Sequence, residues 1–189
     1  MASSVGKWQW ILLCIASLPM LAPLSDTRAA DPQVEFDRAK QLFLHGQLEN
    51  CQQEAERGYE QFKNHNVQWA SKFRVLEAEA MVWRGMYRNG LSVLDAEPST
   101  YFSQEDNTER LTLEGVAYTH LQRFSLARER LNEAERLCAP SNGDACEPVL
   151  RARGVFAEER GEFDEAHSYF LQNLAFARAH GDRLLESTP

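Results

Sequence analysis

The sequence repeats one pattern of small and large apolar residues four times. Each copy carries two small residues twelve positions apart, and these pairs are Ala39 with Cys51, Ala78 with Gly90, Gly115 with Ala127, and Gly154 with Ala166. A turn residue stands within each pair, at Gly46, Gly85, Gln122 and Gly161, which gives intervals of 39, 37 and 39 residues. Small residues let two helices approach closely, while large apolar residues at helical spacing fill the interface. Four copies at a near-constant period predict an all-α fold, an α-solenoid of about four antiparallel helix pairs over residues 31–189.

The pattern of these copies resembles the tetratricopeptide repeat. The matching residues are Gly154, Gly161, Phe163 and Ala166 in the last copy, Gly115, Phe124 and Ala127 in the copy before it, and Pro98 and Pro140 near the ends of second helices. The copies are longer than the basic unit of about 34 residues. The run over residues 173–182 is similar to the long repeats of MalT-type regulators and of the regions that precede caspase-like CHAT domains. The resemblance implies a right-handed solenoid in which a further helix follows. We therefore expect the chain to be truncated at its C-terminus, or else Leu184 and Leu185 to fold back as a short cap.

Residues 1–30 have the character of a signal peptide. Lys7 is the only early charge, an apolar run follows over residues 11–15, and small residues lead to Ala29, after which we expect cleavage. The alternative is an uncleaved N-terminal anchor. However, two prolines interrupt the segment, and its apolar run is shorter than the ~20 residues that a spanning helix needs. We expect an exported protein, periplasmic or extracellular, or else a protein anchored in a membrane and facing outside.

Capping signals and turn residues set the expected helix boundaries. Asp31 followed by Pro32 marks a helix start, with Asp as the N-cap and Pro at the first helical position. Asp106 and Glu109 are expected to form a capping box that opens the third helix pair. The expected helices span residues 32–44, 49–62, 69–84 and 87–96, followed by a third pair that ends near residue 138 and a fourth pair over about 148–179.

Three cysteines belong to the expected solenoid. Cys51 occupies a helix-packing position and is expected to be a small buried hydrophobe. Cys138 and Cys146 flank a short loop in a chain with an export signal, and oxidising compartments favour disulfides. We expect these two cysteines to be bonded, which would contribute about 2–3 kcal/mol by restricting the unfolded chain. The alternative is two free thiols.

The sequence contains no motif typical of catalysis, a cofactor or a metal site. The five histidines are scattered, and no His-x3-His, Cys-x2-Cys or His-Glu-x-x-His spacing occurs. A Gly-x-Ser-x-Gly motif and a phosphate loop are also absent from the sequence. The net charge of −8 argues against nucleic acid, because Lys and Arg on phosphates supply most of that affinity. We expect a protein that is not an enzyme and holds neither a cofactor nor a metal.

The first helix of each pair lines the inner face of a solenoid, so this concave face is the candidate binding surface. Trp83 with Val82 and Phe43 would form an apolar anchor, since aromatic residues dominate interaction hot spots. The alternative for Trp83 is core packing against the neighbouring repeat. The candidate residues are Lys40, Phe43, Leu44, Lys72, Val75, Glu79, Val82, Trp83, Thr112, Val116, Thr119, His120, Arg151, Val155, Glu158 and Glu159.

The sequence therefore predicts a non-catalytic scaffold that binds a peptide or protein segment on its concave face. The alternative is a sensor or regulatory repeat region of a larger CHAT-type protease, whose catalytic domain would lie outside this chain. Contact with a membrane is expected only if residues 8–24 remain as an anchor.

Overall fold

The computed structural model describes residues 31–96, 98–138 and 147–180, and the regular secondary structure in these ranges is entirely helical. The elements are α1 (Pro32–Leu44), α2 (Leu48–Phe62), α3 (Val67–Trp83), α4 (Tyr87–Asp95), the 3-10 turn η1 (Ser99–Tyr101), α5 (Gln104–His120), α6 (Phe124–Cys138), α7 (Glu147–Glu159) and α8 (Phe163–His180). The predicted all-α class is confirmed. The signal peptide predicted over residues 1–30 and the expectations for the C-terminal end lie outside the described residues.

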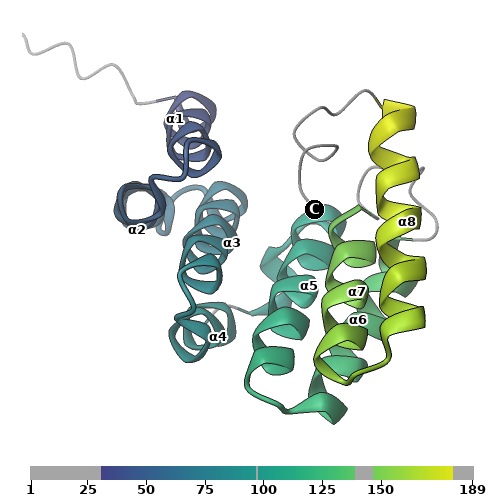
Figure 1. Ribbon diagram of the computed structural model, residues 1–189. Coiled ribbons are helices and arrows are strands. Elements are labelled where there is room, and N and C mark those ends of the chain that lie inside the picture. The colour runs from purple at the N-terminus through teal and green to yellow at the C-terminus, as the bar shows by residue number, and fades with distance from the viewer. Residues whose placement is uncertain (1–30, 97, 139–146, 181–189) are drawn as a thin grey trace, which may run out of the picture.

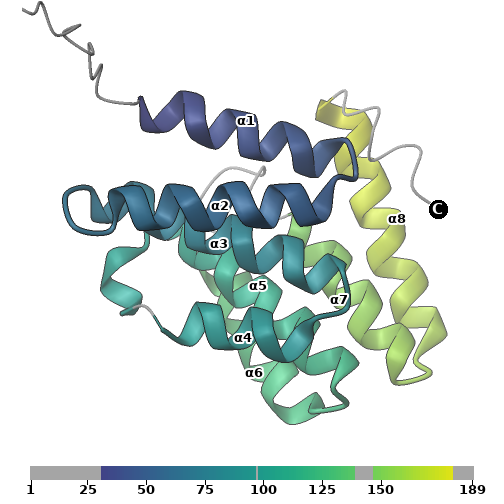
Figure 2. The same cartoon turned by 90° about the vertical axis from the view of Figure 1, so that its left-hand side faces the viewer.

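The helices follow one another in space in the order of the chain. Figure 1 shows α1 and α2 at one end and α8 at the other, with α3 to α7 between them. Figure 2 shows the α1 to α4 side face-on, where α2 lies between α1 and α3. Every helix in the described ranges is too short or too polar to cross a lipid bilayer.

Four tight turns join the helices into the pairs α1/α2, α3/α4, α5/α6 and α7/α8. Each turn contains one residue with left-handed backbone, with φ of 72° at Gly46, 76° at Gly85, 57° at Gln122 and 76° at Gly161. In the first pair, the amide of Gly46 donates to the carbonyl of Phe43 at 2.9 Å, and the next amide donates to a carbonyl five residues earlier, also at 2.9 Å. The other three turns have the same two bonds. This is the Schellman arrangement that ends helices, and it confirms the four predicted turn positions.

Helix starts agree with the sequence in one case and differ in another. Asp31 is the N-cap of α1, and its side chain accepts a hydrogen bond from the amide of Gln33 at 3.0 Å. The capping box predicted from Asp106 and Glu109 is wrong, because α5 begins at Gln104, two residues before Asp106. Its N-cap is Ser103, whose hydroxyl accepts from the Asp106 amide at 3.1 Å and donates to the Asp106 carboxylate at 2.6 Å.

Three helical glycines, Gly58, Gly115 and Gly154, allow close packing because each makes room for a large side chain of a neighbouring helix. A Cβ atom at Gly115 would lie 2.5 Å from Cδ2 of Leu131 in the paired helix α6. Gly154 has the same relation to Phe170. The nearest atoms are therefore not those of the small residue twelve positions on, as the repeat pattern suggested. They belong to the large residue one helical turn beyond it.

The buried residues form a series of clusters along the chain. One cluster joins α1, α2 and α3 around Phe73, a second joins α3, α4 and α5 around Leu94, and two further clusters join α5, α6 and α7 around Leu111 and Leu131. Each cluster is therefore built by consecutive helices. This arrangement leaves one side of the first helices, α1, α3, α5 and α7, available for the site described next.

Candidate functional site

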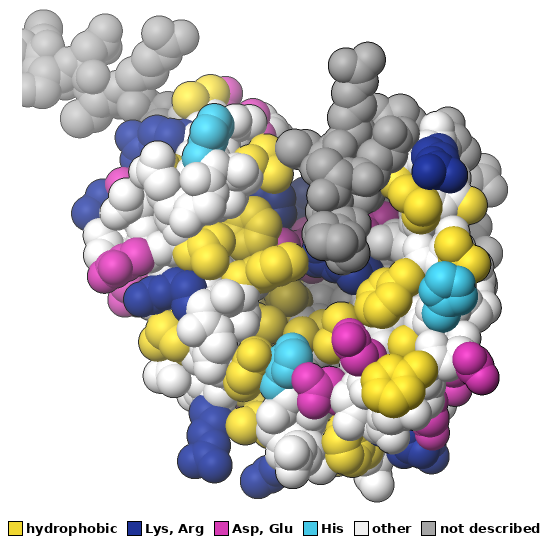
Figure 3. All heavy atoms as spheres, viewed as in Figure 1, with side chains coloured by type: hydrophobic (Ala, Val, Ile, Leu, Met, Phe, Trp, Pro, Cys, Tyr) yellow, Lys and Arg dark blue, Asp and Glu magenta, His cyan; other side chains and the backbone are white. Residues whose placement is uncertain are grey.

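A cavity of about 640 Å³ opens between the first helices of the four pairs. Its volume lies within the range of roughly 300–1,000 Å³ that is typical of ligand sites. The lining residues are Lys40, Phe43, Leu44, Glu79, Val82, Trp83, Tyr87, Glu105, Thr108, Glu109, Thr112, Leu113, Val116, His120, Glu147, Pro148, Arg151, Ala152 and Val155. All of them except Tyr87 belong to α1, α3, α5 or α7. In the space-filling view, hydrophobic side chains gather around the hollow on this face (Figure 3).

The apolar part of the cavity is built around Trp83, the last residue of α3. Its side chain is 50% exposed, so it lies at the cavity surface rather than in the core. The ring centroid of Trp83 is 6.2 Å from that of Phe43 with an interplanar angle of 82°, and the guanidinium of Arg151 lies 4.7 Å from the Trp83 ring centroid. Edge-to-face and cation–π contacts of this kind are favourable. They fix the indole between α1 and α7 while leaving about half of it free for another molecule.

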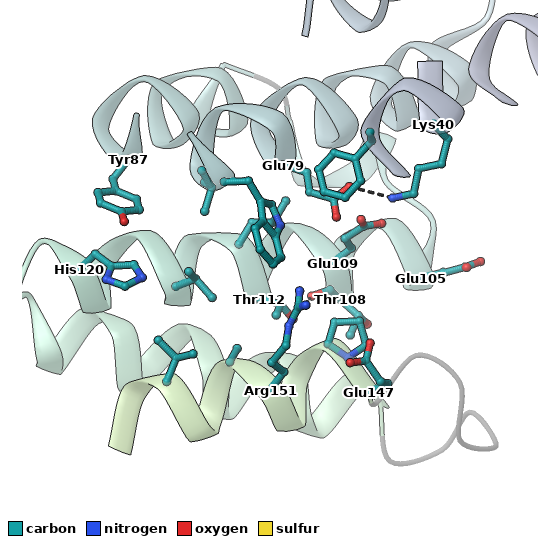
Figure 4. Close-up of a pocket in the computed structure, with 18 of the residues that line it drawn as sticks. Lys40, Glu79, Tyr87, Glu105, Thr108, Glu109, Thr112, His120, Glu147 and Arg151 are labelled. Carbon is teal, nitrogen blue, oxygen red and sulfur yellow. Dashed lines mark hydrogen bonds and ion pairs between the residues drawn. The ribbon is translucent and has the colours of Figure 1, made fainter. Parts of the chain in front are cut away.

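The acidic part of the cavity lies where α1, α3 and α5 meet. The ammonium of Lys40 is 2.8 Å from the carboxylate of Glu79, an ion pair that joins α1 to α3. Glu109 of α5 projects into the same region (Figure 4). Burial of its carboxyl group, followed by repulsion from Glu79, raises the pKa of Glu109 to about 7, although Lys40 opposes this shift. A carboxyl that titrates near neutral pH can change its charge under ordinary conditions, and this one does so inside a cavity.

The opposite end of the cavity is marked by a stacked pair. The rings of Tyr87 and His120 are nearly parallel, with centroids 4.7 Å apart and an interplanar angle of 19°. The Nδ1 atom of His120 also lies 3.5 Å from a carboxylate oxygen of Glu159. These contacts tie α4 and α5 to α7 at this end, so the cavity has a polar boundary on either side of its apolar part.

Most of the residues predicted for the concave face line this cavity. They are Lys40, Phe43, Leu44, Glu79, Val82, Trp83, Thr112, Val116, His120, Arg151 and Val155. The structure brings these side chains together from four helices that are far apart in the sequence. The rule that the first helix of each pair lines the inner face named all four of these helices.

Five predicted residues lie elsewhere, because the predicted face was wider than one side of a helix. Val75 and Thr119 are buried, and the Thr119 hydroxyl donates to the carbonyl of Gly115 in its own helix at 2.8 Å. Lys72 lies over the ring of Trp69 and 4.0 Å from the carboxylate of Asp106. Glu158 and Glu159 are exposed and do not line the cavity.

Sequence reasoning missed eight lining residues, of which five lie near the N-terminal ends of α5 and α7. They are Glu105, Thr108 and Glu109 in α5, Glu147 and Pro148 in α7, together with Leu113, Ala152 and Tyr87. Glu105, Thr108 and Glu109 continue the stripe of Thr112 and Val116 backwards at helical spacing. They were missed because the start of α5 was placed too late, which gave Glu109 a capping role.

Neither Cys51 nor Cys138 lines the cavity. Cys51 is free and fully buried, and burial raises the pKa of its thiol to about 11. Cys138 is disulfide-bonded, but Cys146 lies outside the described residues, so their pairing stays a prediction. No group of His, Cys, Asp and Glu in the described part of the chain is arranged to hold a metal ion.

Searches against protein-family models, curated proteins and solved structures give no match for this chain. The geometry of the cavity is therefore the basis for a functional conclusion. It offers a half-exposed indole with neighbouring apolar side chains, next to a cluster of carboxylates of which one titrates near neutral pH.

Proposed function

We propose that this chain is a non-catalytic binding module, a right-handed α-solenoid of tetratricopeptide type that holds a peptide or protein segment in its cavity. The observation that carries the proposal is that the residues lining the cavity come from corresponding helices of the successive pairs. Four consecutive helix pairs each present their first helix to one hollow, as expected for the concave face of stacked helix pairs.

The lining also has the mixed character of a binding site. Val82, Val116 and Val155 supply apolar surface around Trp83, while charged groups lie at the edge of this surface. Binding energy at protein interfaces is concentrated in a few buried aromatic and Arg residues. Trp83, with Arg151 stacked on it, is the strongest candidate for such an anchor.

The proposed place of action is outside the cytoplasm. The basis is the signal peptide predicted over residues 1–30, and a disulfide at Cys138 is in keeping with an oxidising compartment. Sequencing the N-terminus of the exported protein tests this part, and a chain that still begins at residue 1 would favour the anchor instead.

Selection of peptides from a random display library on the full chain tests the binding function. The affinities of the selected peptides are then measured by fluorescence anisotropy for wild type and for Trp83→Ala. We expect this substitution to weaken binding about 5- to 30-fold, as loss of an aromatic hot spot does. Because Trp83 is 50% exposed, its replacement should leave the helical content unchanged.

The matched control is Phe163→Ala. Phe163 is 70% exposed, and it belongs to α8 and does not line the cavity. This variant should bind the selected peptides as wild type does. Equal binding by wild type and Trp83→Ala would remove the cavity as the binding site, and loss of helicity in Trp83→Ala would show that Trp83 supports the fold.

A further inference from the structure

The charges that line the cavity are unequal. Four carboxylates, those of Glu79, Glu105, Glu109 and Glu147, face the same space as two cations, Lys40 and Arg151. The carboxylates come from α3, α5 and α7, so the excess negative charge surrounds one part of the cavity rather than one helix. A ligand that enters this part meets a negative potential, strengthened by the low dielectric of the protein walls.

Both cations of the lining already have partners. Lys40 is bound to Glu79 at 2.8 Å, and the guanidinium of Arg151 lies on the ring of Trp83. Neither of them forms an ion pair with Glu105 or Glu109. An incoming anion would add to this repulsion, whereas an incoming cation would relieve it.

Glu109 shares the attraction of Lys40 with Glu79, which holds the ion pair. No side chain in residues 31–96, 98–138 and 147–180 forms a hydrogen bond or an ion pair of normal length with it, and Figure 4 shows it directed into the cavity. Protein atoms surround its carboxyl group on most sides, although part of the residue remains accessible from the cavity. A buried carboxylate without a donor is costly, and a cationic group from a ligand would remove that cost.

We propose that the segment bound in this cavity carries a Lys or Arg side chain beside a large apolar one. The cation would lie against Glu109 and Glu79, and the apolar side chain would lie against Trp83 and Val116. The inference rests on the proposed binding function and names the chemistry of its partner. The basic and the apolar side chain are both needed. An isolated ion pair at the surface contributes little binding free energy, whereas a desolvated ion pair beside apolar contacts contributes more.

Binding of such a segment should weaken as the pH falls through the pKa of Glu109, about 7. The groups that face Glu109 are Glu105 and Asp106 from α5, Glu79 from α3 and Lys40 from α1, with Glu147 and Arg151 of α7 across the cavity. A ligand cation favours the ionised carboxylate, so binding at low pH must first remove its proton. If the Glu109 carboxyl alone must lose its proton, the affinity for the segment should be about tenfold lower at pH 6 than at pH 8.

The experiment uses the peptides selected on the full chain. Their sequences should be enriched in Lys or Arg next to a large apolar residue. In the strongest Arg-containing peptide, Arg is replaced by citrulline, which is neutral and nearly isosteric; acetyl-lysine serves for Lys. We expect this replacement to weaken binding to wild type at least tenfold and to weaken binding to Glu109→Gln much less, as residues in direct contact do in a double-mutant cycle.

The matched control is Glu129→Gln, since Glu129 is exposed on α6 and does not line the cavity. It should keep the wild-type response to citrulline and the wild-type pH dependence, while Glu109→Gln loses the pH dependence. Selected peptides that depend on Trp83 but carry no basic residue, or are enriched in acidic residues, would overturn this inference and leave the binding function intact. Peptides that bind Trp83→Ala as well as wild type would overturn both.

Discussion

Glu109 allows a quantitative test of the cavity that needs no ligand. Its pKa is raised from 4.5 to about 7, first by burial and then by Glu79. The folded state therefore holds a proton that the unfolded chain releases between these two pH values. Stability from this group is fully present below pH 4.5 and is lost as the pH rises toward 7. The substitution Glu109→Gln keeps the shape of the side chain and removes the charge, so the variant avoids this loss.

The magnitude follows from the difference between the two pKa values. Each pH unit corresponds to about 1.4 kcal/mol, so ionisation of Glu109 costs the folded protein up to about 3 kcal/mol above pH 7. Water that reaches Glu109 through the cavity lowers this cost of ionisation. We therefore expect Glu109→Gln to be roughly 1–3 kcal/mol more stable than wild type at pH 8. Near pH 4.5 the two proteins should be about equally stable.

Urea unfolding followed by far-UV circular dichroism, between about pH 5 and pH 8, measures this difference. The control is Glu105→Gln, because Glu105 lies one turn earlier on α5, lines the same cavity and is exposed. Its effect should stay within about 0.5 kcal/mol across the range. A stability difference for Glu109→Gln that is constant with pH, or that grows toward low pH, would refute the assignment of a raised pKa to this carboxyl.

Three further substitutions test the packing of the helix pairs, each by the same unfolding assay. Gln122→Gly should stabilise the protein by about 0.5–1 kcal/mol, since a residue with a side chain pays for the φ of 57° that glycine adopts freely; a loss of stability would mean that the Gln122 side chain has a role of its own. Gly115→Ala should destabilise by about 1–3 kcal/mol because the new Cβ would lie 2.5 Å from Leu131, and adding Leu131→Val should recover part of this loss. Glu114→Ala should cost about 3–5 kcal/mol, because Glu114 is buried and pairs with Arg130 at 2.9 Å; a change below 1 kcal/mol would show that water replaces the lost carboxylate.

The positions of the helix pairs could be predicted because the signals are local. Turn residues at near-constant intervals marked where each pair reverses, and Gln122 was identified although it is not a glycine, because it stands where Gly46, Gly85 and Gly161 stand in the other copies. The start of α5 was misplaced for a different reason. Ser103, Asp106 and Glu109 offer two overlapping cap patterns, and only the backbone shows that Ser103 is the N-cap.

The candidate site could be predicted in part. The topology of stacked pairs selects the first helices, and with them Trp83, Glu79 and Arg151. It does not give the rotation of each helix finely enough to separate His120, which lines the cavity, from Thr119, which is buried beside it. Nor does it show that Glu109 lies beside Glu79, since that contact joins α5 to α3 and depends on how two pairs pack.

Gln122 and Glu109 each work against folding, and their locations differ in a way that bears on function. Gln122 holds a left-handed backbone in an exposed turn, where glycine would serve the fold better. Glu109 holds a carboxylate in a cavity, where glutamine would serve the fold better. Natural sequences depart from the locally favourable choice most often where function requires it. Gln122 does not line the cavity, whereas Glu109 faces the same space as Trp83. The destabilising carboxylate is explained if a cation that enters this space with the ligand pairs with it.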